Sequence, residues 1–417
     1  MWARPIPRFS PTFSPRELRA AVRSFLPAAT VHVADFERAF ADYIGVGHAV
    51  MVPSARMGVY LLLQAWGIKP GDEVLLPSLT YFSVPSIMVS LGVKPVFVDV
   101  GRNSYLMDPA DLERKITSRS VAAVPTHLYG LPCDMDPILA ICRKSGLKVI
   151  EDVAQATGAR YKGQRVGSFG DASYYTFGLT KNITTLQGGM LTTSDDALAA
   201  KLREITHSHT PLAKKPLVKD TMVGAAMMMI TRPWIYPFTL HPMMLVQGRM
   251  GHDYLEAAFG EPEVLYEEVP DWFFHSAPTP TQAAVGLAQL QRIDGLNGLR
   301  AHHGRYLLEH LAHADGMILP RLVSGAEPIF MSFPIQVNDV KRVQAHLLAE
   351  GVDTARGYMK DCSTLPIFAG KVGGSGTCPN AKKIEEQILH LPVHPNLSRG
   401  DLSHLVEAAR RAVGGVN

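Results

Sequence analysis

Short, wholly apolar runs alternate with stretches of helical pattern along this chain, and no other feature limits its fold as strongly. The runs cover residues 74–76, 95–98, 121–124 and 149–150, each close to a Gly, Asp or Pro that can end a strand. Strands with continuous rather than alternating apolar character are buried on both faces. We therefore expect a mostly parallel α/β sheet over the first 290 residues, with ligands at the carboxyl ends of its strands.

Capping signals mark the helices between these runs. An oxygen-bearing side chain followed by proline, which suits the first helical position, occurs at Ser14-Pro15, Asp108-Pro109 and Asp136-Pro137. A helical stripe from residue 280 to about residue 311 leads into a second region, whose last helix is predicted to begin at Ser398. The pattern predicts a large domain of residues 1–290 and a smaller C-terminal α/β domain of residues 291–417.

Composition narrows the class of protein. Of 417 residues, 47% are hydrophobic and 19% charged, and the net charge of +3 is too small to favour nucleic acid as a partner. The four cysteines and sixteen histidines show no metal-ligand spacing, so we expect no metal site. The N-terminus has no secretory signal, and the longest apolar run, residues 222–230, is far below the roughly 20 residues that cross a bilayer. These features predict a cytoplasmic protein with a small-molecule substrate.

Two charged residues lie where chemistry is expected. Asp152 ends the apolar run at 149–150, which places its carboxylate at the ligand edge of the sheet, and Lys181 lies in a loop before another apolar stretch. An aspartate and a lysine at this separation are more often surface or structural charges than a functional pair. The sequence motifs around Asp152 and Lys181 decide between these interpretations.

Residues 151–156 (EDVAQA), residues 166–171 and the Lys181-Asn182 segment resemble the signature of the DegT/DnrJ/EryC1/StrS family of sugar aminotransferases. The likeness extends upstream through residues 70–81, 94–99 and 126–130, resumes at 282–290 and weakens at 391–395. It implies a pyridoxal 5'-phosphate enzyme of transferase fold type I, similar to aspartate aminotransferase, that works as a homodimer with shared active sites. It also implies an amino donor, L-glutamate, and a nucleotide-linked keto-sugar acceptor, in surface-polysaccharide or secondary-metabolite sugar biosynthesis.

The same resemblance assigns the catalytic pair. Lys181 occupies the position of the amine that joins the cofactor covalently and then moves protons. Asp152 matches the anion that keeps the pyridine nitrogen protonated. His127 and Asn182 are weaker candidates for substrate contact, since a lone histidine at a strand end is more often structural.

Further family positions concern the cofactor's ring and phosphate. Tyr81 is expected to stack on the ring, although a packing role beside Phe82 stays open. Gln155 is expected to brace the ring side. Residues 54–56 precede an apolar helix whose free amides suit a phosphate, and Thr176 matches a hydroxyl donor to the same group. For these polar residues a cap or turn hydrogen bond is the alternative.

The sequence departs from the family at two places. The phosphate loop usually reads Ser-Gly-Thr, whereas here Ser54 is followed by Ala55 and Arg56, so an additional cation is expected near the phosphate or the substrate. Where the family has an asparagine that reaches the neighbouring subunit's phosphate, and a nearby arginine, this chain has His275 and Ala277. We expect His275 to make the cofactor contact across the subunit boundary, or the contact to be absent.

Residues 221–250 are the compositional exception, with seven of the 17 methionines. Three interpretations are open: a dimer-interface arm, a lid over an apolar substrate, or a peripheral contact with the inner membrane face near a lipid-linked substrate. The same features leave two other functions open. One is a different reaction of this cofactor on the same scaffold, such as dehydration or condensation with an acyl or lipid substrate. The other is a non-catalytic regulatory or binding protein.

Overall fold

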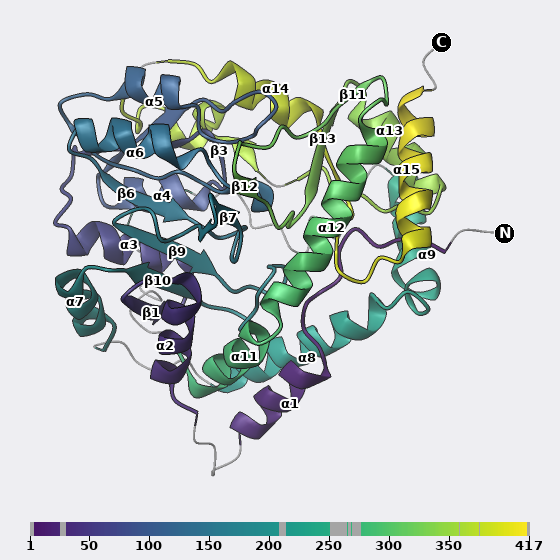
Figure 1. The fold of residues 1–417 in the computed structure, drawn as a ribbon, viewed down its shortest axis with the longest axis horizontal. Helices are drawn as coiled ribbons and strands as arrows, with labels where there is room; N and C mark the ends of the chain where they lie inside the picture. The colour runs from purple at the N-terminus through teal and green to yellow at the C-terminus, as the bar shows by residue number, and fades with distance from the viewer. Residues whose placement is uncertain are drawn as a thin grey trace.

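The computed structural model describes residues 4–25, 31–207, 214–250, 265, 268, 277–357, 359–374 and 376–414. A large α/β region and a smaller C-terminal region lie side by side, and the long helix α12 runs along both (Figure 1). One extensive apolar core includes residues of both regions.

The large region is built on a seven-stranded sheet of mixed direction. Four neighbouring pairs, from β9 through β6, β5 and β2 to β4, are parallel, and β10 pairs antiparallel with both β1 and β9. The expected parallel α/β architecture is therefore confirmed. In spatial order the strands are β1 (His48–Val52), β10 (Gly189–Thr193), β9 (Ala172–Thr176), β6 (Lys148–Asp152), β5 (Ser120–Ala123), β2 (Glu73–Pro77) and β4 (Lys94–Val98).

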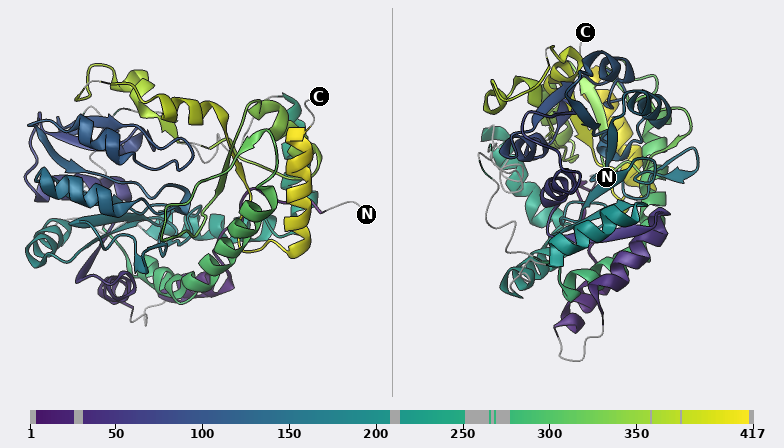
Figure 2. Two further views of the ribbon diagram at one scale, coloured as in Figure 1. Left: turned by 45° about the horizontal axis from the view of Figure 1, so that its top comes forward. Right: turned by 90° about the vertical axis from the view of Figure 1, so that its left-hand side faces the viewer.

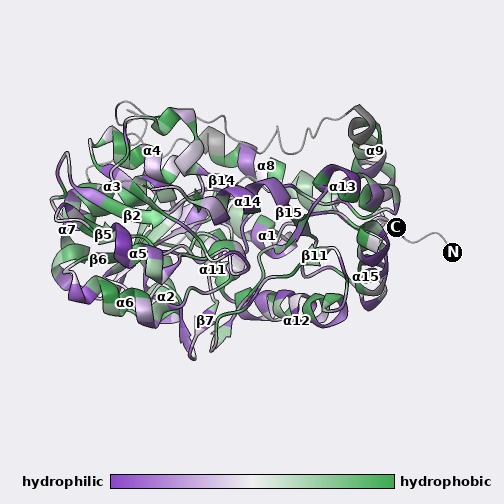
Figure 3. Cartoon of the chain, turned by 90° about the horizontal axis from the view of Figure 1, so that it is seen from above, coloured by the Kyte–Doolittle hydropathy of each residue, from purple (hydrophilic) through white to green (hydrophobic). Residues whose placement is uncertain are grey.

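Helices cover both faces of this sheet. Seen from above in Figure 3, α3 and α4 lie on one side of β2, β5 and β6, and α2, α5 and α6 lie on the other. The helices of the large region are α2 (Val33–Ile44), α3 (Ala55–Ala65), α4 (Ser83–Ser90), α5 (Pro109–Lys115), α6 (Met135–Lys144) and α7 (Asp196–His207). Strands buried between two helical layers explain why the apolar runs show no alternation.

Most predicted helix starts are confirmed. Ser14 begins α1 (Pro15–Ser24) through a reciprocal capping box with Glu17, and Asp108 accepts a hydrogen bond from the Ala110 amide at 2.9 Å. The start predicted at Asp136 is wrong, because α6 begins at Met135 and Asp136 lies within its first turn. An acid is favourable at either position, since the first turn of a helix leaves several amides without intrahelical partners.

The smaller region packs helices against an antiparallel sheet of β11 (Met317–Ile318), β13 (Phe333–Val337) and β15 (Ile388–Leu391). The helical stretch predicted from residue 280 is two helices, α11 (Pro280–Leu290) and α12 (Ile293–Leu311). Figure 2 shows α12 running from the large region to the smaller one. The remaining helices are α13 (Val340–Ala349), α14 (Pro379–Gln387) and α15 (Arg399–Gly414).

Chain crossings tie the two regions together at several places. Ile6 forms a parallel bridge with Val352 of the smaller region, although it lies near the N-terminal end. In the opposite direction, β14 (Lys360–Asp361) returns to pair with β3 (Leu79–Thr80) in the large region. Two further small pairings use β7 (Arg160–Tyr161), which lies between β8 (Gln164–Arg165) and β12 (Ala326–Glu327).

The methionine-rich segment is helical. It forms most of α8 (Lys214–Ile230), the short turn η2 (Tyr236–Phe238) and α9 (Leu240–Met250), with α8 packed against α1 and η2 beside α9. Among the residues that the structure describes, no helix is both long and apolar enough to cross a membrane.

Candidate active site

A cavity of about 430 Å³ lies between the carboxyl ends of the central strands and the smaller region. The large region contributes strand-end residues, among them Thr126, Asp152 and Thr176, and the smaller region contributes residues around Met331, Asp353 and His390. The position is the one expected of a ligand in an open parallel sheet. Of the residues predicted from sequence, the cavity wall includes Ser54, Ala55, Arg56, Tyr81, Asp152, Gln155, Thr176 and Lys181.

Asp152 presents a buried carboxylate to this cavity. The Ala154 amide donates to its Oδ1 at 2.9 Å, and the Thr126 hydroxyl lies 3.4 Å from Oδ2. Burial raises the pKa of Asp152, while the Tyr174 hydroxyl, the Ala154 amide and the positive charge of Lys181 act in the opposite direction. A desolvated carboxylate of this kind is suited to a cationic N–H partner.

Lys181 reaches the same cavity from a loop that is held at both sides. Its own amide donates to the Gly178 carbonyl at 3.0 Å. The next side chain, Asn182, is buried and donates from Nδ2 to the Thr157 carbonyl at 2.8 Å and to Asn297 Oδ1 at 3.2 Å. Asn182 thus anchors the loop and does not line the cavity, so the structure does not bring it to a substrate.

The start of α3 offers an anion site. Ser54 is the N-cap, and its Oγ accepts a hydrogen bond from the Met57 amide at 3.2 Å. Ala55 and Arg56 occupy the first turn, where backbone amides and the helix dipole favour an anion. Strand β10 passes so close that a Cβ on Gly189 would lie 3.0 Å from the Ala55 amide nitrogen. Glycine at 189 therefore leaves this turn undisturbed.

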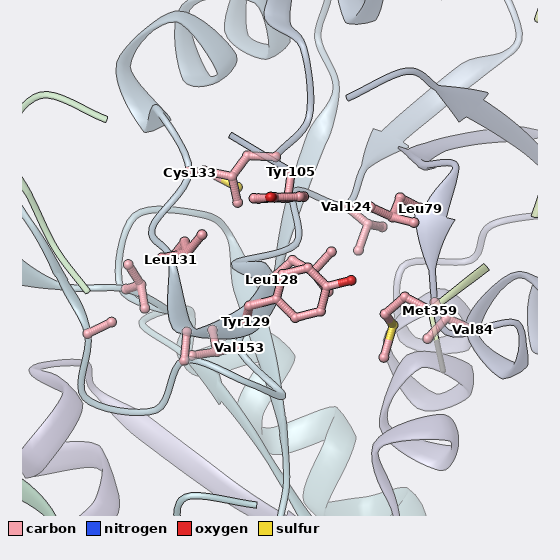
Figure 4. Packing of buried hydrophobic residues seen from close by; sticks show 14 of the residues in the cluster. Leu79, Val84, Tyr105, Val124, Leu128, Tyr129, Leu131, Cys133, Val153 and Met359 are labelled. Atoms are coloured by element: carbon pink, nitrogen blue, oxygen red, sulfur yellow. The ribbon is translucent and has the colours of Figure 1, made fainter. Parts of the chain in front are cut away.

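Tyr81 and Gln155 also line the cavity. The Tyr81 ring lies 4.9 Å from the Phe82 ring, tilted by 49°, and also lines the cavity. Gln155 is buried, and its Oε1 accepts a hydrogen bond of 2.9 Å from the amide of Tyr129, whose φ is +58°. Gln155 therefore stabilises a left-handed turn that a tyrosine adopts only with tertiary support. Figure 4 shows this tyrosine with Leu128 and Met359, which also line the cavity.

His127 is turned away from the cavity. It is fully buried, its Nδ1 accepts from the Cys133 amide at 3.0 Å, and its Nε2 lies 3.0 Å from Glu151 Oε2. The amides of Gly167, Phe169 and Gly170 each donate to Glu151 at 2.7 Å. Both ring nitrogens are thus engaged within the protein, and His127 is not among the residues that line the cavity, so the weak expectation that it contacts substrate stays a prediction.

His275 lies outside the described residues, so the structure gives no position for it. Within the described part of the chain, no group of three or more His, Cys, Asp or Glu side chains is arranged to hold a metal ion. All four cysteines are buried, and no disulfide bond joins them.

Several cavity residues were not anticipated from sequence. The Arg8 guanidinium bonds Asp353 at 2.7 to 3.0 Å, and the Tyr236 hydroxyl donates to the same carboxylate at 3.1 Å. The methionine-rich segment also contributes Met227, Thr231 and Leu240 to the wall. The length and apolar character of that segment marked it as unusual, but nothing local showed where it would pack.

The chemistry of the residues that line this cavity suits pyridoxal phosphate. A lysine and a buried carboxylate share one cavity, a helix N-terminus with small residues opens onto it, and an aromatic ring forms part of its wall. Comparison with known proteins agrees. The model of the DegT/DnrJ/EryC1/StrS aminotransferase family matches residues 15–231 and 278–410. The chain belongs to this family.

Relatives share most of its length. A GDP-perosamine synthase of Caulobacter vibrioides is 33% identical over 390 residues, which is 90% of this chain and 88% of that protein. A UDP-N-acetyl-3-dehydro-alpha-D-glucosamine 3-aminotransferase of Acidithiobacillus ferrooxidans is 32% identical over 380 residues, covering 91% and 88%. The crystal structure of DesV from S. venezuelae with a ketimine intermediate has a TM-score of 0.78 and 27% identity, covering both chains completely.

As a member of this family, the chain is a pyridoxal-phosphate-dependent sugar aminotransferase. The family model has no match between residues 231 and 278, an interval that contains η2 and α9.

Proposed function

We propose that the chain transfers an amino group from L-glutamate to a nucleotide-linked keto-sugar, with Lys181 and Asp152 as its catalytic residues. The observation that carries the proposal is that these two side chains, far apart in sequence, line one cavity at the carboxyl ends of the strands. The names of the relatives support the acceptor class, since they act on GDP-, UDP- and dTDP-linked sugars.

Pyridoxal phosphate, when bound, supplies an aldehyde that takes up the amino group and a ring that accepts electrons as a Cα–H bond breaks. The residues hold it in defined ways. Asp152 keeps a proton on the ring nitrogen through a charge-assisted hydrogen bond. The amides at Ala55 and Arg56, with the hydroxyls of Ser54 and Thr176, bind the phosphate, and Tyr81 covers a ring face.

Lys181 Nζ has two tasks in this proposal. When the cofactor is bound, Nζ would hold its aldehyde carbon, and as a free amine Nζ would accept a proton from the donor's Cα and donate a proton to a neighbouring atom. The anchoring of the loop through Asn182 keeps Nζ within the cavity during both tasks. Gln155 acts indirectly, by holding the Tyr129 turn against the cofactor's ring side.

Borohydride reduction of the loaded protein tests the assignment. We expect the cofactor's mass on the peptide that contains Lys181, and 2-oxoglutarate on incubation with L-glutamate. Lys181→Ala is expected to lose both signals, whereas Lys371→Ala, at an exposed lysine, should keep them. A label on another peptide, or turnover by Lys181→Ala, would reject the proposal. A panel of nucleotide-linked keto-sugars then identifies the acceptor.

The protein is also proposed to be a homodimer. Most of the exposed large apolar side chains in the described residues cluster in α8, η2 and α9 or the turn between them, at Val218, Met222, Met229, Trp234, Phe238, Met243 and Val246. An apolar surface of this kind usually marks a contact with another macromolecule. A second copy of the chain is the occupant that the shared active sites of the family imply. We also propose a cytoplasmic location, because the four cysteines form no disulfide bonds.

A second candidate acceptor follows from the cavity wall. Met227 and Leu240, from the methionine-rich segment, give the cavity apolar surface beside its charged residues. This favours an acceptor with an apolar portion, or another reaction of the same cofactor on such a substrate. Of the three interpretations of residues 221–250, the lid is supported by these inward-facing residues, and the dimer arm by the outward-facing ones. Formation of 2-oxoglutarate separates transamination from other reactions.

A further inference from the structure

Arg300 is a buried cation in the cavity wall. It lies on α12 with 4% of its surface exposed, and it lines the cavity together with His394 of the smaller region. Among the residues that the structure describes, no hydrogen bond or ion pair engages its guanidinium, and its Nε is buried without a partner. An arginine this deeply buried is ordinarily paired, because burial of a lone charge is unfavourable.

The other charges of the cavity do not neutralise it. Arg8, Arg56, Lys181 and Arg300 face two carboxylates, those of Asp152 and Asp353. Asp353 is already engaged by Arg8 at 2.7 Å, and Asp152 faces the positive charge of Lys181. The cavity therefore has an excess of positive charge, and the guanidinium of Arg300 has no acid assigned to it.

The neighbours of Arg300 do not offer a second cation. Burial lowers the pKa of His394 to about 3 and also lowers the pKa of His303, and the charge of Arg300 acts in the same direction on both. Burial lowers the pKa of Arg300 itself to about 10, so it remains charged at neutral pH. The single positive charge of the Arg300 guanidinium is therefore matched by a ligand group with a single negative charge.

We propose that Arg300 binds a carboxylate of the amino donor, an inference that rests on the proposed function. A guanidinium and a carboxylate match as two parallel hydrogen bonds. The group that enters must be small, because Arg300 is almost wholly enclosed, and the amino donor must enter the cavity completely to meet Lys181. A nucleotide diphosphate is larger and more highly charged, and it can remain at the cavity mouth. The cofactor's phosphate has its own site at the start of α3.

Titration with glutarate, a dicarboxylate without an amine, tests the site without turnover. The cofactor-loaded wild type is compared with Arg300→Gln, Arg300→Lys and Arg305→Gln, an exposed arginine on the same helix. We expect calorimetry to show at least tenfold weaker glutarate binding for Arg300→Gln, partial recovery for Arg300→Lys, and no change for Arg305→Gln. The KM for L-glutamate should rise in the same order.

A structural role predicts a different result. If Arg300 only supports the fold, Arg300→Gln should lower the melting temperature and weaken the cofactor too, which would overturn the inference. We expect instead that the cofactor-free Arg300→Gln protein melts no lower than the wild type, since it loses an uncompensated buried charge. Absence of glutarate binding by the wild type, or equal binding by Arg300→Gln, would also overturn the inference. Weaker UDP binding with unchanged glutarate binding would assign Arg300 to the acceptor's phosphate instead.

The test separates this inference from the proposed function. A wild type that forms 2-oxoglutarate from L-glutamate, with an unchanged KM in Arg300→Gln, rejects the carboxylate site and leaves the aminotransferase assignment intact. If the wild type binds glutarate through Arg300 but forms no 2-oxoglutarate from L-glutamate, the proposal that L-glutamate is the donor is rejected. The inference that Arg300 binds a carboxylate then still holds.

Discussion

The Tyr236 hydroxyl donates a hydrogen bond of 3.1 Å to Oδ2 of Asp353, and this contact joins the methionine-rich segment to the smaller region at the cavity wall. Both side chains are buried, and Arg8 binds the same carboxylate from the N-terminal stretch. Three segments that are remote in sequence therefore meet at one carboxylate. An element outside the ranges matched by the family model thereby contributes to the cavity wall.

Tyr236→Phe removes that bond and keeps the ring. Since Arg8 still satisfies Asp353, we expect a loss of about 0.5 to 1.5 kcal/mol in stability and faster proteolysis within residues 221–250. The KM for the acceptor should rise more than the KM for L-glutamate, because Met227 and Leu240 lose a fixed position. Thermal melting, limited proteolysis and steady-state kinetics measure these effects, with Tyr306→Phe, outside the cavity wall, as control. Unchanged proteolysis and KM would show that the segment is held by other contacts.

Asp152→Asn is expected to weaken cofactor binding but to raise the melting temperature of the cofactor-free protein. In the loaded protein it removes a charge-assisted hydrogen bond of roughly 1.5 to 3 kcal/mol, so cofactor affinity should fall about ten- to a hundredfold. In the cofactor-free protein it removes a desolvated charge, so the melting temperature at neutral pH should rise. Cofactor titration by absorbance and melting curves test both signs, and Asp315→Asn at an exposed site is the control.

The difference in stability between the cofactor-free wild type and Asp152→Asn should depend on pH, because the pKa of Asp152 is raised. A carboxyl whose folded pKa exceeds its unfolded value, about 3.9, stabilises the fold most below that value and loses this contribution as pH rises through the folded pKa. The cofactor-free wild type and Asp152→Asn should therefore melt alike near pH 3.5 and diverge above pH 4, with the wild type lower. A difference that is constant with pH would contradict the assignment of the effect to ionisation.

His127→Phe tests the structural role of that residue. The change leaves the Cys133 amide and Glu151 without their buried partner, which should cost about 1 to 3 kcal/mol. The KM values for both substrates should change little, since the ring does not line the cavity. Melting curves and kinetics measure this, with exposed His302→Phe as control. A raised acceptor KM with unchanged stability would restore the idea of substrate contact.

Measurement of the oligomeric state tests whether the outward face of the methionine-rich segment forms a dimer contact. Light scattering should give twice the chain mass of 45.5 kDa for the wild type, and Trp234→Ser with Phe238→Ser should shift the population toward monomer. Leu299→Ser, which removes an exposed leucine on α12, should remain dimeric. A monomeric wild type that floats with anionic liposomes at low salt would instead favour the membrane interpretation.

The sequence predicted those parts of the protein that are encoded locally. The apolar runs that became β2, β4, β5 and β6 needed only a few adjacent residues to be visible, and so did the capping box at Ser14. The positions of Lys181 and Asp152 were found because the residues around them match family motifs. Whether a segment forms a helix or a strand depends on the backbone preferences and burial of a few neighbouring residues. A sequence pattern covers the same short range, so it can predict these elements.

Orientation was not predictable in the same way. His127 and Asn182 lie in the same family motifs as the proposed catalytic residues, yet each is turned into the protein by partners such as Glu151 and Asn297. A motif fixes the order of residues along the chain. Which side of a strand end or loop faces the cavity depends on the hydrogen-bond partners that neighbouring elements bring.

The sequence by itself determined the α/β class and the family, and it singled out Lys181 and Asp152 as the proposed catalytic pair. Only the tertiary structure decided that the methionine-rich segment contributes to the cavity wall and that, among the described residues, no acid binds the Arg300 guanidinium there. The physical reason is distance along the chain. Arg8 and Asp353 are 345 positions apart, and such contacts form only when two regions close around a shared cavity, so no local pattern records them.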